Sequence, residues 1–147
     1  MARWVLETTE DWVPALLRIA LGGVMFPHGA QKLLGWFGGY GFLGTMEFMT
    51  GMGMPAVVAF LVILGESLGA LALVLGFLTR FCAFSLTLIM VGAIGLVHWQ
   101  HGFFMNWGGQ AAGEGFEYHL LMVALGVVLM VRGGGGWSID GLLTKRR

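Results

Sequence analysis

The sequence predicts an all-α fold, an integral membrane four-helix bundle with both termini on one side of the bilayer. Three observations predict it: a mean hydropathy of +0.82, a charged content of only 11%, and apolar stretches long enough to cross a membrane. A soluble domain carries about 25% charged residues, so 8 basic and 8 acidic residues in a chain of 147 are too few to cover a water-exposed surface. We expect a single transmembrane domain over residues 1–147.

The first two spans follow from apolar length, because a helix needs about 20 residues to cross the hydrocarbon core. One span is predicted over 13–34 and contains Arg18, and the other is predicted over 55–77, where Glu66 is the only charge. A charge at the centre of a span costs about 2.5–3.5 kcal/mol on insertion scales. Both charged side chains are therefore expected to have partners.

The third span is easily recognised from its apolar length, whereas the start of the fourth span is not. The third is predicted over 81–99 and is polar only at a serine, a threonine and His98. The clean apolar part of the fourth is too short to cross, so we predict a longer span over 112–131. Glu117 and His119 would then lie in the outer layer of the membrane or line a cavity.

Basic residues indicate the orientation. They gather at the termini and at the turn between the second and third spans, whereas the opposite side holds only Lys32. By the positive-inside rule, we expect both termini in the cytoplasm, with the tail 137–147 as a short interfacial segment. The basic residues on this side are Arg3, Arg80, Arg132, Lys145, Arg146 and Arg147.

Glycine is the other compositional outlier, with 26 residues in the chain against an average usage near 7%. Small residues let helices approach closely in lipid, so the glycines of the second and third spans are expected at helix contacts. Glycines between spans suggest compact turns or re-entrant backbone, and Gly133 to Gly136 suggest a flexible connector. The span glycines are Gly65, Gly69, Gly76, Gly92 and Gly95; those after the first span are Gly35, Gly38, Gly39, Gly41 and Gly44.

Arg18 and Glu66 are predicted to form a structural ion pair that joins the first two spans. At 1.5 Å of rise per residue, Glu66 lies near the middle of the bilayer and Arg18 lies closer to the inner face, at a separation that a long side chain covers. The alternative is that Arg18 extends to the inner interface while a protonated Glu66 packs in the core.

Polar residues converge at the outer ends of three spans. His28 and Lys32 share a helix face, His98 lies at the end of the third span, and Glu117 and His119 open the fourth. Each has a plainer interpretation as a helix-end or interfacial residue; Lys32, for example, could extend to lipid phosphate. Together, in a chain with so few charges, they indicate a functional site.

This set of residues suits the head group of a quinone or quinol. His28, Lys32, His98 and Glu117 would supply hydrogen bonds and protons, because imidazole titrates near neutral pH. The ring of the head group could rest on side chains around them. These are Trp36, Trp99, Phe103 and His119.

Other site types have less support. A metal site built from His28, His98 and Glu117 is the weaker alternative, since imidazole and carboxylate suit iron, zinc or copper but the spacing matches no metal motif. The single cysteine, Cys82, excludes an internal disulfide. No basic arm precedes the C-terminal end, which argues against nucleic-acid binding, and no phosphate-binding glycine motif is present.

One set of residues occurs in a fixed order along the chain: Arg18, His28-Gly29-x-x-Lys32, Phe37-Gly38-Gly39-x-Gly41-x-x-Gly44, Gly53-x-Pro55, Glu66-x-x-Gly69, Gly76-x-x-x-Arg80, His98, Gly102-Phe103-Phe104 and Glu117-Tyr118. As a set, it resembles the DoxX family of small four-span bacterial membrane proteins over nearly the whole chain. The resemblance implies a multi-pass protein of the bacterial inner membrane with an oxidoreductase function. Some relatives resemble subunits of thiosulfate:quinone oxidoreductase.

Two main functional hypotheses follow. The first is a membrane redox protein that interacts with quinone or quinol at the outer end of the bundle. The alternative is a non-catalytic accessory or assembly subunit of a larger membrane complex, whose glycine-rich faces and aromatic belts contact a protein partner or a second copy. A small-solute channel is a third hypothesis, weakened by the absence of an internal repeat. In each case the lipid bilayer surrounds the chain.

Overall fold

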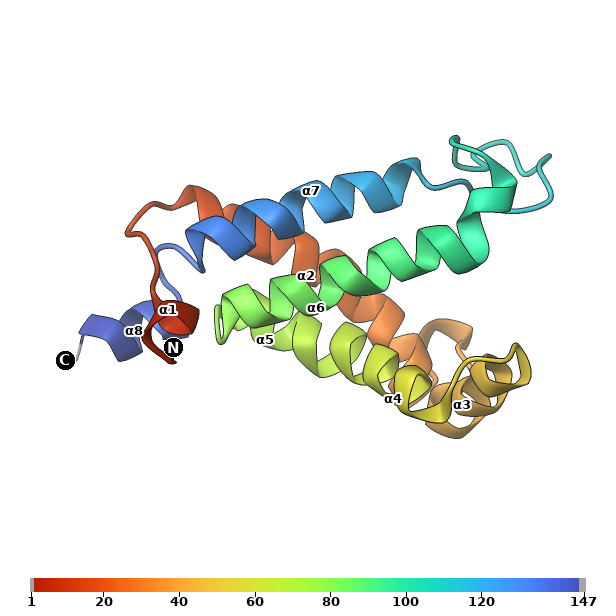
Figure 1. The fold of residues 1–147 in the computed structure, drawn as a ribbon, viewed down its shortest axis with the longest axis horizontal. Helices are drawn as coiled ribbons and strands as arrows, with labels where there is room; N and C mark the ends of the chain where they lie inside the picture. The colour runs from red at the N-terminus through yellow and green to blue at the C-terminus, as the bar shows by residue number, and fades with distance from the viewer. Residues whose placement is uncertain (1, 146–147) are drawn as a thin grey trace.

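The computed structural model describes residues 2–145, which contain helices and loops and no strand. Four helical segments run side by side along the long axis of the molecule (Figure 1). Their bounds are α2 (Val13–Leu34); α4 (Ala56–Leu64), the π-helix η2 (Gly65–Gly69) and α5 (Ala70–Leu75) in sequence; α6 (Thr79–Ala93), the π-helix η3 (Ile94–His98) and the 3₁₀ helix η4 (Trp99–His101) in sequence; and α7 (Glu117–Arg132).

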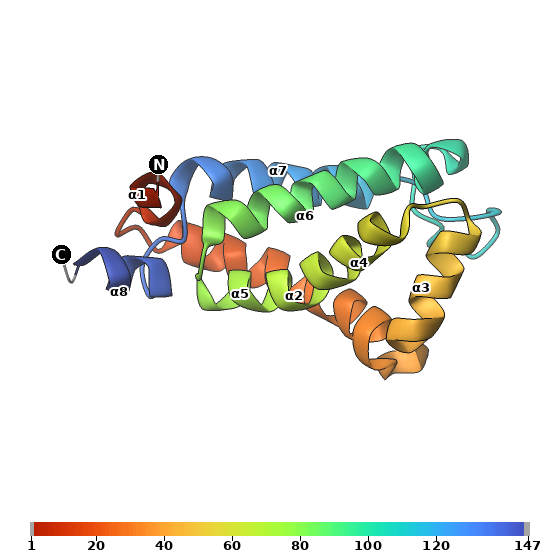
Figure 2. The same cartoon turned by 60° about the horizontal axis from the view of Figure 1, so that its bottom comes forward.

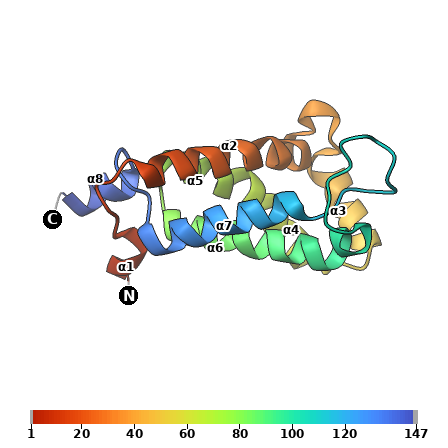
Figure 3. The same cartoon turned by 90° about the horizontal axis from the view of Figure 1, so that it is seen from above.

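The two ends of the bundle differ. Both termini lie at one end, here called the terminal end, together with the short helices α1 (Ala2–Leu6) and α8 (Ile139–Lys145). The other end, here called the distal end, carries η1 (Trp36–Gly38), α3 (Gly41–Gly51) and the loop 102–116 (Figure 3). The distal end is the end that the sequence analysis treats as the outer one.

Three of the four segments are long and apolar enough to cross a membrane: Val13–Leu34, Ala56–Leu75 and Thr79–His101. The fourth helix, α7, has 16 residues and begins at Glu117, five residues later than the predicted span. It begins there because the backbone amides before it are already bonded elsewhere: Gly115 donates to Phe104 and Phe116 donates to Gly102. The loop thereby satisfies its own backbone without helix, as irregular chain at membrane depth must.

Helix α3 replaces the turns predicted from the glycines after the first span. It leaves the bundle at a steep angle and crosses the distal end (Figure 2). Gly35 ends α2 in the left-handed conformation at φ 74°. Thr45 and Met49 are four residues apart and both buried, so they give α3 one face that packs against α2 and α4.

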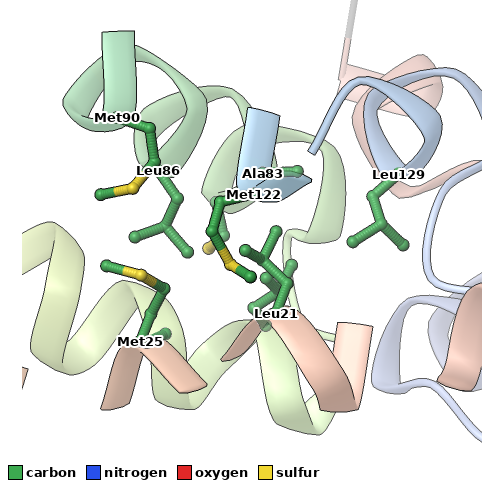
Figure 4. Packing of buried hydrophobic residues seen from close by; sticks show 10 residues of the cluster. Leu21, Met25, Ala83, Leu86, Met90, Met122 and Leu129 are labelled. Carbon is green, nitrogen blue, oxygen red and sulfur yellow. The ribbon is translucent and has the colours of Figure 1, made fainter. Parts of the chain in front are cut away.

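The core lies where α2, α5, α6 and α7 meet. Leu21 and Met25 from α2 lie among Leu86 and Met90 from α6 and Met122 from α7 (Figure 4). Lipid tails are as apolar as these side chains, so the association of the helices depends on shape and close packing. Unbranched methionine fills irregular gaps, which suits a junction of four helices.

Close helix contacts fall at one predicted glycine, Gly65, where a Cβ would collide with Ile89 of α6, and at three glycines outside the predicted set. A Cβ on Gly22 or Gly29 would collide with the main chain of α5 or η2, and a Cβ on Gly126 would collide with Thr87 of α6. The predicted contact glycines Gly92 and Gly95 face open space instead. The pattern of glycines in one span therefore did not reveal which face is packed, because that depends on the neighbouring helix.

Arg18 binds backbone carbonyls at the terminal end and is not paired with Glu66. Its guanidinium donates to the carbonyl oxygens of Val74, Gly134 (3.0 Å), Gly136 (3.4 Å) and Trp137 (2.8 Å). The Val74 carbonyl belongs to the last turn of α5, where carbonyls have no partner within the helix. The predicted Arg18–Glu66 pair is therefore wrong. Arg18 extends toward the terminal end, in the direction that the alternative gave it, and Glu66 is paired with Lys32 instead of packing alone in the core.

The segment Gly133–Gly136 is a fixed structural element and not the flexible connector predicted from its glycines. Its first three residues are buried, and the amide of Gly135 donates to the Thr8 hydroxyl at 2.5 Å. A Cβ at Gly134 would crowd Thr79 and Ser138. Glycine is needed here because the loop passes close to three other parts of the chain.

Asp140 in the C-terminal tail caps helix α6. Its buried carboxylate accepts hydrogen bonds from the amides of Leu78 (2.8 Å) and Thr79 (2.9 Å). These amides open α6 and have no partner within the helix. Asp140 also lies within electrostatic range of Arg18, so the tail predicted as interfacial contributes a buried countercharge.

Basic side chains at the terminal end are bound to nearby carbonyl oxygens, an aromatic ring and a carboxylate. Arg80 donates to the carbonyls of Glu7 (3.1 Å) and Met130 (3.0 Å), and its guanidinium lies 4.7 Å from the ring centroid of Trp4. The Lys145 ammonium, hydrogen-bonded at 2.7 Å, lowers the pKa of the exposed Glu10 carboxyl. Arg146 and Arg147 lie outside the described residues, as does the side chain of Arg3.

Replacing Asp140 tests the cap. Asp140→Ala leaves two buried amides without acceptors, which costs about 2–3 kcal/mol. We expect a lower thermal unfolding temperature in detergent, measured by circular dichroism. Glu10→Ala removes an exposed ion pair and is the matched control, for which we expect no change. Equal unfolding temperatures for the two variants would show that the cap contributes nothing.

Candidate functional site

An ion pair between Lys32 and Glu66 lies at the centre of the distal half of the bundle. The Lys32 Nζ is 2.5 Å from a carboxylate oxygen of Glu66. The Glu66 side chain is 6% exposed and that of Lys32 is 24% exposed, so the carboxylate is buried while the ammonium reaches the protein surface. The pair neutralises two charges that would otherwise be costly at this depth.

Local backbone geometry brings the pair together. Glu66 lies in the π-helix η2, and Gly29 on α2 approaches the main chain of Glu66 so closely that a Cβ there would collide with it. Lys32 follows three residues later in α2 and shares that face. π-Helical turns within α-helices occur frequently at functional sites.

Side-chain direction explains why Glu66 pairs with Lys32 and not with Arg18. Side chains on an α-helix tilt toward its N-terminus, and the N-terminus of α2 lies at the terminal end of the bundle. Arg18 therefore extends toward the terminal end, away from Glu66. Lys32, in the last turn of α2, extends back toward the middle of the bundle and meets Glu66.

A pocket of about 280 Å³ adjoins the ion pair between α2 and α3. Its polar lining includes Gln31, Lys32 and Thr45. Its aromatic lining is formed by Tyr40 and Phe48, whose rings stack at 5.9 Å between centroids and 25° between planes. The remaining lining residues are Gly38, Gly39 and Met49.

This pocket contains one of the predicted site residues, Lys32. Gln31, which precedes Lys32 in α2, was not singled out from the sequence, and the other lining residues lie in α3 or just before it, in a stretch predicted as turns. One signal was present: Thr45 and Met49 are four residues apart, with Phe48 between them, which is helical spacing. The glycines around these residues are typical of turns, so the helical spacing was not recognised.

The predicted histidines lie apart from the pocket. His98 and His119 face each other from η3 and α7, with ring centroids 4.0 Å apart. His28 is exposed. It lies within electrostatic range both of the ion pair and of His119, whose ring is tilted against that of His98.

Glu117 organises the loop 102–116 and does not face the histidines. Its carboxylate accepts hydrogen bonds from the Met105 amide (2.9 Å) and the Trp107 indole (3.3 Å). Within residues 2–145, no three His, Cys, Asp or Glu side chains are placed to hold a metal ion. The structure therefore does not support the alternative metal site of His28, His98 and Glu117.

The predicted aromatic residues of a quinone pocket are dispersed. Trp99 stacks on Phe116 at 5.4 Å between centroids, and Phe103 meets the same ring edge-on at 5.6 Å. Trp36 lies against Phe37. Trp36, Trp99, Phe103 and His119 are not among the residues that line the pocket beside Lys32.

The ion pair can be tested by removing one partner or both. Lys32→Met leaves the buried Glu66 carboxylate unpaired, and we expect a loss of about 2 kcal/mol. This is less than the 3–5 kcal/mol typical of a fully buried pair, because Lys32 is partly exposed. The double variant Lys32→Met with Glu66→Leu should recover stability, since no unpaired charge remains.

The measurement is unfolding in detergent, with Lys145→Met as the control for an exposed pair. If the double variant were less stable than Lys32→Met alone, Lys32 and Glu66 would not be coupled as the structure shows.

Comparison with known proteins gives a consistent assignment. Residues 13–99, which include the ion pair and the pocket, match the DoxX family. The chain is 35% identical over 112 residues to "Inner membrane protein YqjF" of Escherichia coli (strain K12), covering 76% of this chain and 82% of that protein. It is 28% identical over 114 residues to "Putative oxidoreductase CatD" of Bacillus subtilis (strain 168), covering 78% and 75%. No solved structure matches the chain. The chain belongs to the DoxX family of membrane proteins.

Proposed function

We propose that this chain binds the head group of a quinone or quinol in the pocket between α2 and α3. The observation that carries the proposal is Lys32, which is paired with Glu66 and lines a pocket with both polar and aromatic side chains. This location differs from the site expected among His28, His98 and Glu117. Lys32 is the one residue that belongs both to the expected site and to this pocket.

The pocket fits one substituted ring. Its volume of about 280 Å³ is slightly below the range of roughly 300–1,000 Å³ found for small-molecule sites. A head group would fill it, and an isoprenoid tail would extend into the bilayer. The stacked rings of Tyr40 and Phe48 offer an aromatic wall, against which a planar ring can pack.

The polar lining suits ring oxygens. The Lys32 ammonium is a charged donor, and charge-assisted hydrogen bonds are roughly twice as strong as neutral ones. The Gln31 amide and the Thr45 hydroxyl are further donors in the same pocket. Donors on more than one side can hold oxygens at opposite positions of a ring.

Glu66 lies behind Lys32 and is not among the residues that line the pocket. A quinone, when bound, supplies two-electron, two-proton chemistry. The Glu66 carboxylate is hydrogen-bonded to Lys32 and holds the Lys32 ammonium at the pocket wall, where the ammonium can stabilise negative charge on a ring oxygen. Electrons would come from or go to a redox centre on a partner protein.

The relatives extend the proposal to location and activity. We assign the chain to the bacterial inner membrane, with the terminal end and its basic residues Arg80, Arg132 and Lys145 on the cytoplasmic side. The oxidoreductase name of one relative agrees with a redox role. In the alternative, an accessory subunit, the chain would only position a partner that carries the redox centre.

Quinone binding can be measured with the chain in lipid nanodiscs, with short-chain ubiquinone and short-chain menaquinone as probes in titration calorimetry. Lys32→Met removes a charged hydrogen bond worth about 1.5–3 kcal/mol, so we expect the Kd to rise about 10–100-fold. Thr45→Val removes only a hydroxyl from a buried position, and we expect a rise of about fivefold.

Trp99→Leu is the matched control, because Trp99 stacks on Phe116 outside the pocket and should leave the Kd unchanged. Quinone extracted by organic solvent from the purified protein would support the proposal further. Absence of binding for both probes would overturn it. A stoichiometric partner with redox cofactors that co-purifies with such a non-binding chain would establish the accessory role instead.

A further inference from the structure

The loop 102–116, which joins η4 to α7 at the distal end, has its two ends tied together. The amide of Phe116 donates to the carbonyl oxygen of Gly102, and the amide of Gly115 donates to that of Phe104, each at 3.2 Å. The chain therefore projects from the bundle and returns to the same place (Figure 3). Compact loops with joined ends frequently have a function of their own.

Hydrogen bonds inside the loop give it one shape. The side-chain amide of Asn106 donates to the carbonyl of Ala111 and accepts from its amide, both at 3.0 Å. The main-chain amide of Asn106 donates to the Glu114 carboxylate at 2.7 Å. The Trp107 indole donates to the Glu117 carboxylate at the start of α7, so the loop is also fixed to the bundle.

This fixed loop holds two aromatic side chains away from the protein. Trp107 is 88% exposed and Phe104 is 75% exposed. The indole of Trp107 is oriented by its hydrogen bond to Glu117, and the ring of Phe104 meets that of Phe103 edge-on at 5.2 Å between centroids. Because these rings are already ordered, a partner that binds them pays little conformational entropy.

The composition of the loop favours an uncharged partner surface. Between residues 102 and 116 there is no lysine or arginine, and Glu114 is the only charged residue. Its carboxylate already accepts a hydrogen bond from within the loop. The loop therefore offers no free cation to an acidic partner, whereas exposed tryptophan and phenylalanine are typical of protein at a membrane–water interface.

Helix length places the loop at the level of the lipid headgroups. The segment Thr79–His101 has 23 residues and spans about 34 Å at 1.5 Å per residue. A hydrocarbon core is about 30 Å thick, and the bilayer measures about 40–45 Å with its headgroup layers. The loop begins directly after His101, so it starts just outside the hydrocarbon. Irregular backbone is tolerated at that level, because water reaches the headgroups.

The exposed aromatic rings also continue the lipid-facing surface of the bundle. Leu96 and Trp99 are exposed on the membrane-spanning segment that leads into the loop. Trp99 stacks on Phe116 at 5.4 Å, and Phe116 meets Phe103 at 5.6 Å. A continuous series of rings thus leads from the lipid-facing helix to Phe104.

We propose that the loop 102–116 is a preformed membrane anchor, which lies in the headgroup layer at the distal end and places Phe104 and Trp107 against lipid. The partner is the phospholipid bilayer, at the boundary between headgroups and acyl chains. Since the loop carries no cation, the anchor does not require anionic lipid. The anchor is independent of the proposed quinone pocket, which none of these residues line.

The test measures the depth of Trp107 by fluorine NMR, with the chain in lipid nanodiscs and fluorotryptophan in place of its six tryptophans. Trp107→Phe, or Trp107→Tyr if that variant does not fold, identifies the Trp107 signal. Lipid with a spin label beside the acyl carbonyl should broaden this signal at least about threefold more than lipid labelled at the chain end, since half of a core of about 30 Å separates the labels. Nanodiscs of phosphatidylcholine and of phosphatidylglycerol should agree within about twofold.

Two loop variants provide the comparison. Phe104→Ser removes one aromatic contact with lipid and should lower the broadening of the Trp107 signal about twofold. Gln110→Ser, at an exposed polar position of the same loop, is the matched control and should leave it unchanged. Equal broadening in these two variants would overturn the role of Phe104.

The unmodified chain decides the main point even if a loop variant does not fold. If a water-soluble gadolinium chelate broadened the Trp107 signal while neither lipid label did so, the loop would lie in water and the proposal would be overturned. The exposed rings would then be a surface for a protein partner. Quinone titrations of the same nanodiscs report separately on the proposed function.

Discussion

The distal half of the structure depends on the close contact between Gly29 and the main chain of Glu66. Without a side chain at Gly29, α2 lies directly against the π-helical turn η2. That proximity places the Glu66 carboxylate within reach of Lys32, and Lys32 in turn lines the pocket beside α3. A larger residue at position 29 would separate the helices and the charges together, so packing and electrostatics cannot be considered apart here.

The two ends of the bundle neutralise their buried charges in different ways. At the terminal end, Arg18 is neutralised mainly by the dipoles of backbone carbonyls, which come from a helix end and from the loop 133–136. At the distal end, Lys32 and Glu66 neutralise each other. Carbonyl dipoles hold the Arg18 cation through several fixed backbone atoms, whereas the distal pair balances one side-chain charge directly against another.

Hydropathy alone predicts the fold class and the three long spans, because apolar length is a local property of the sequence. The need of Arg18 and Glu66 for partners could also be predicted, but the partners could not. Their choice depends on side-chain direction along α2 and on the carbonyls of a distant loop. The α3 helix and the pocket could not be predicted, because the glycines in that stretch are typical of turns. Glu117 was grouped with the histidines because it is close to them in the predicted spans. Its hydrogen bonds to the loop depend on the tertiary fold and cannot be inferred from the sequence.

The short helix α7 has a consequence for the surrounding lipid. Its 16 residues span about 24 Å at 1.5 Å per residue, whereas the 23 residues of Thr79–His101 span about 34 Å and a hydrocarbon core is about 30 Å thick. The chain thus has unequal hydrophobic thickness around its circumference. Lipid beside α7 therefore meets a shorter apolar helix than lipid beside α6 does, and a bilayer that matches both must thin locally on the α7 side, at an elastic cost.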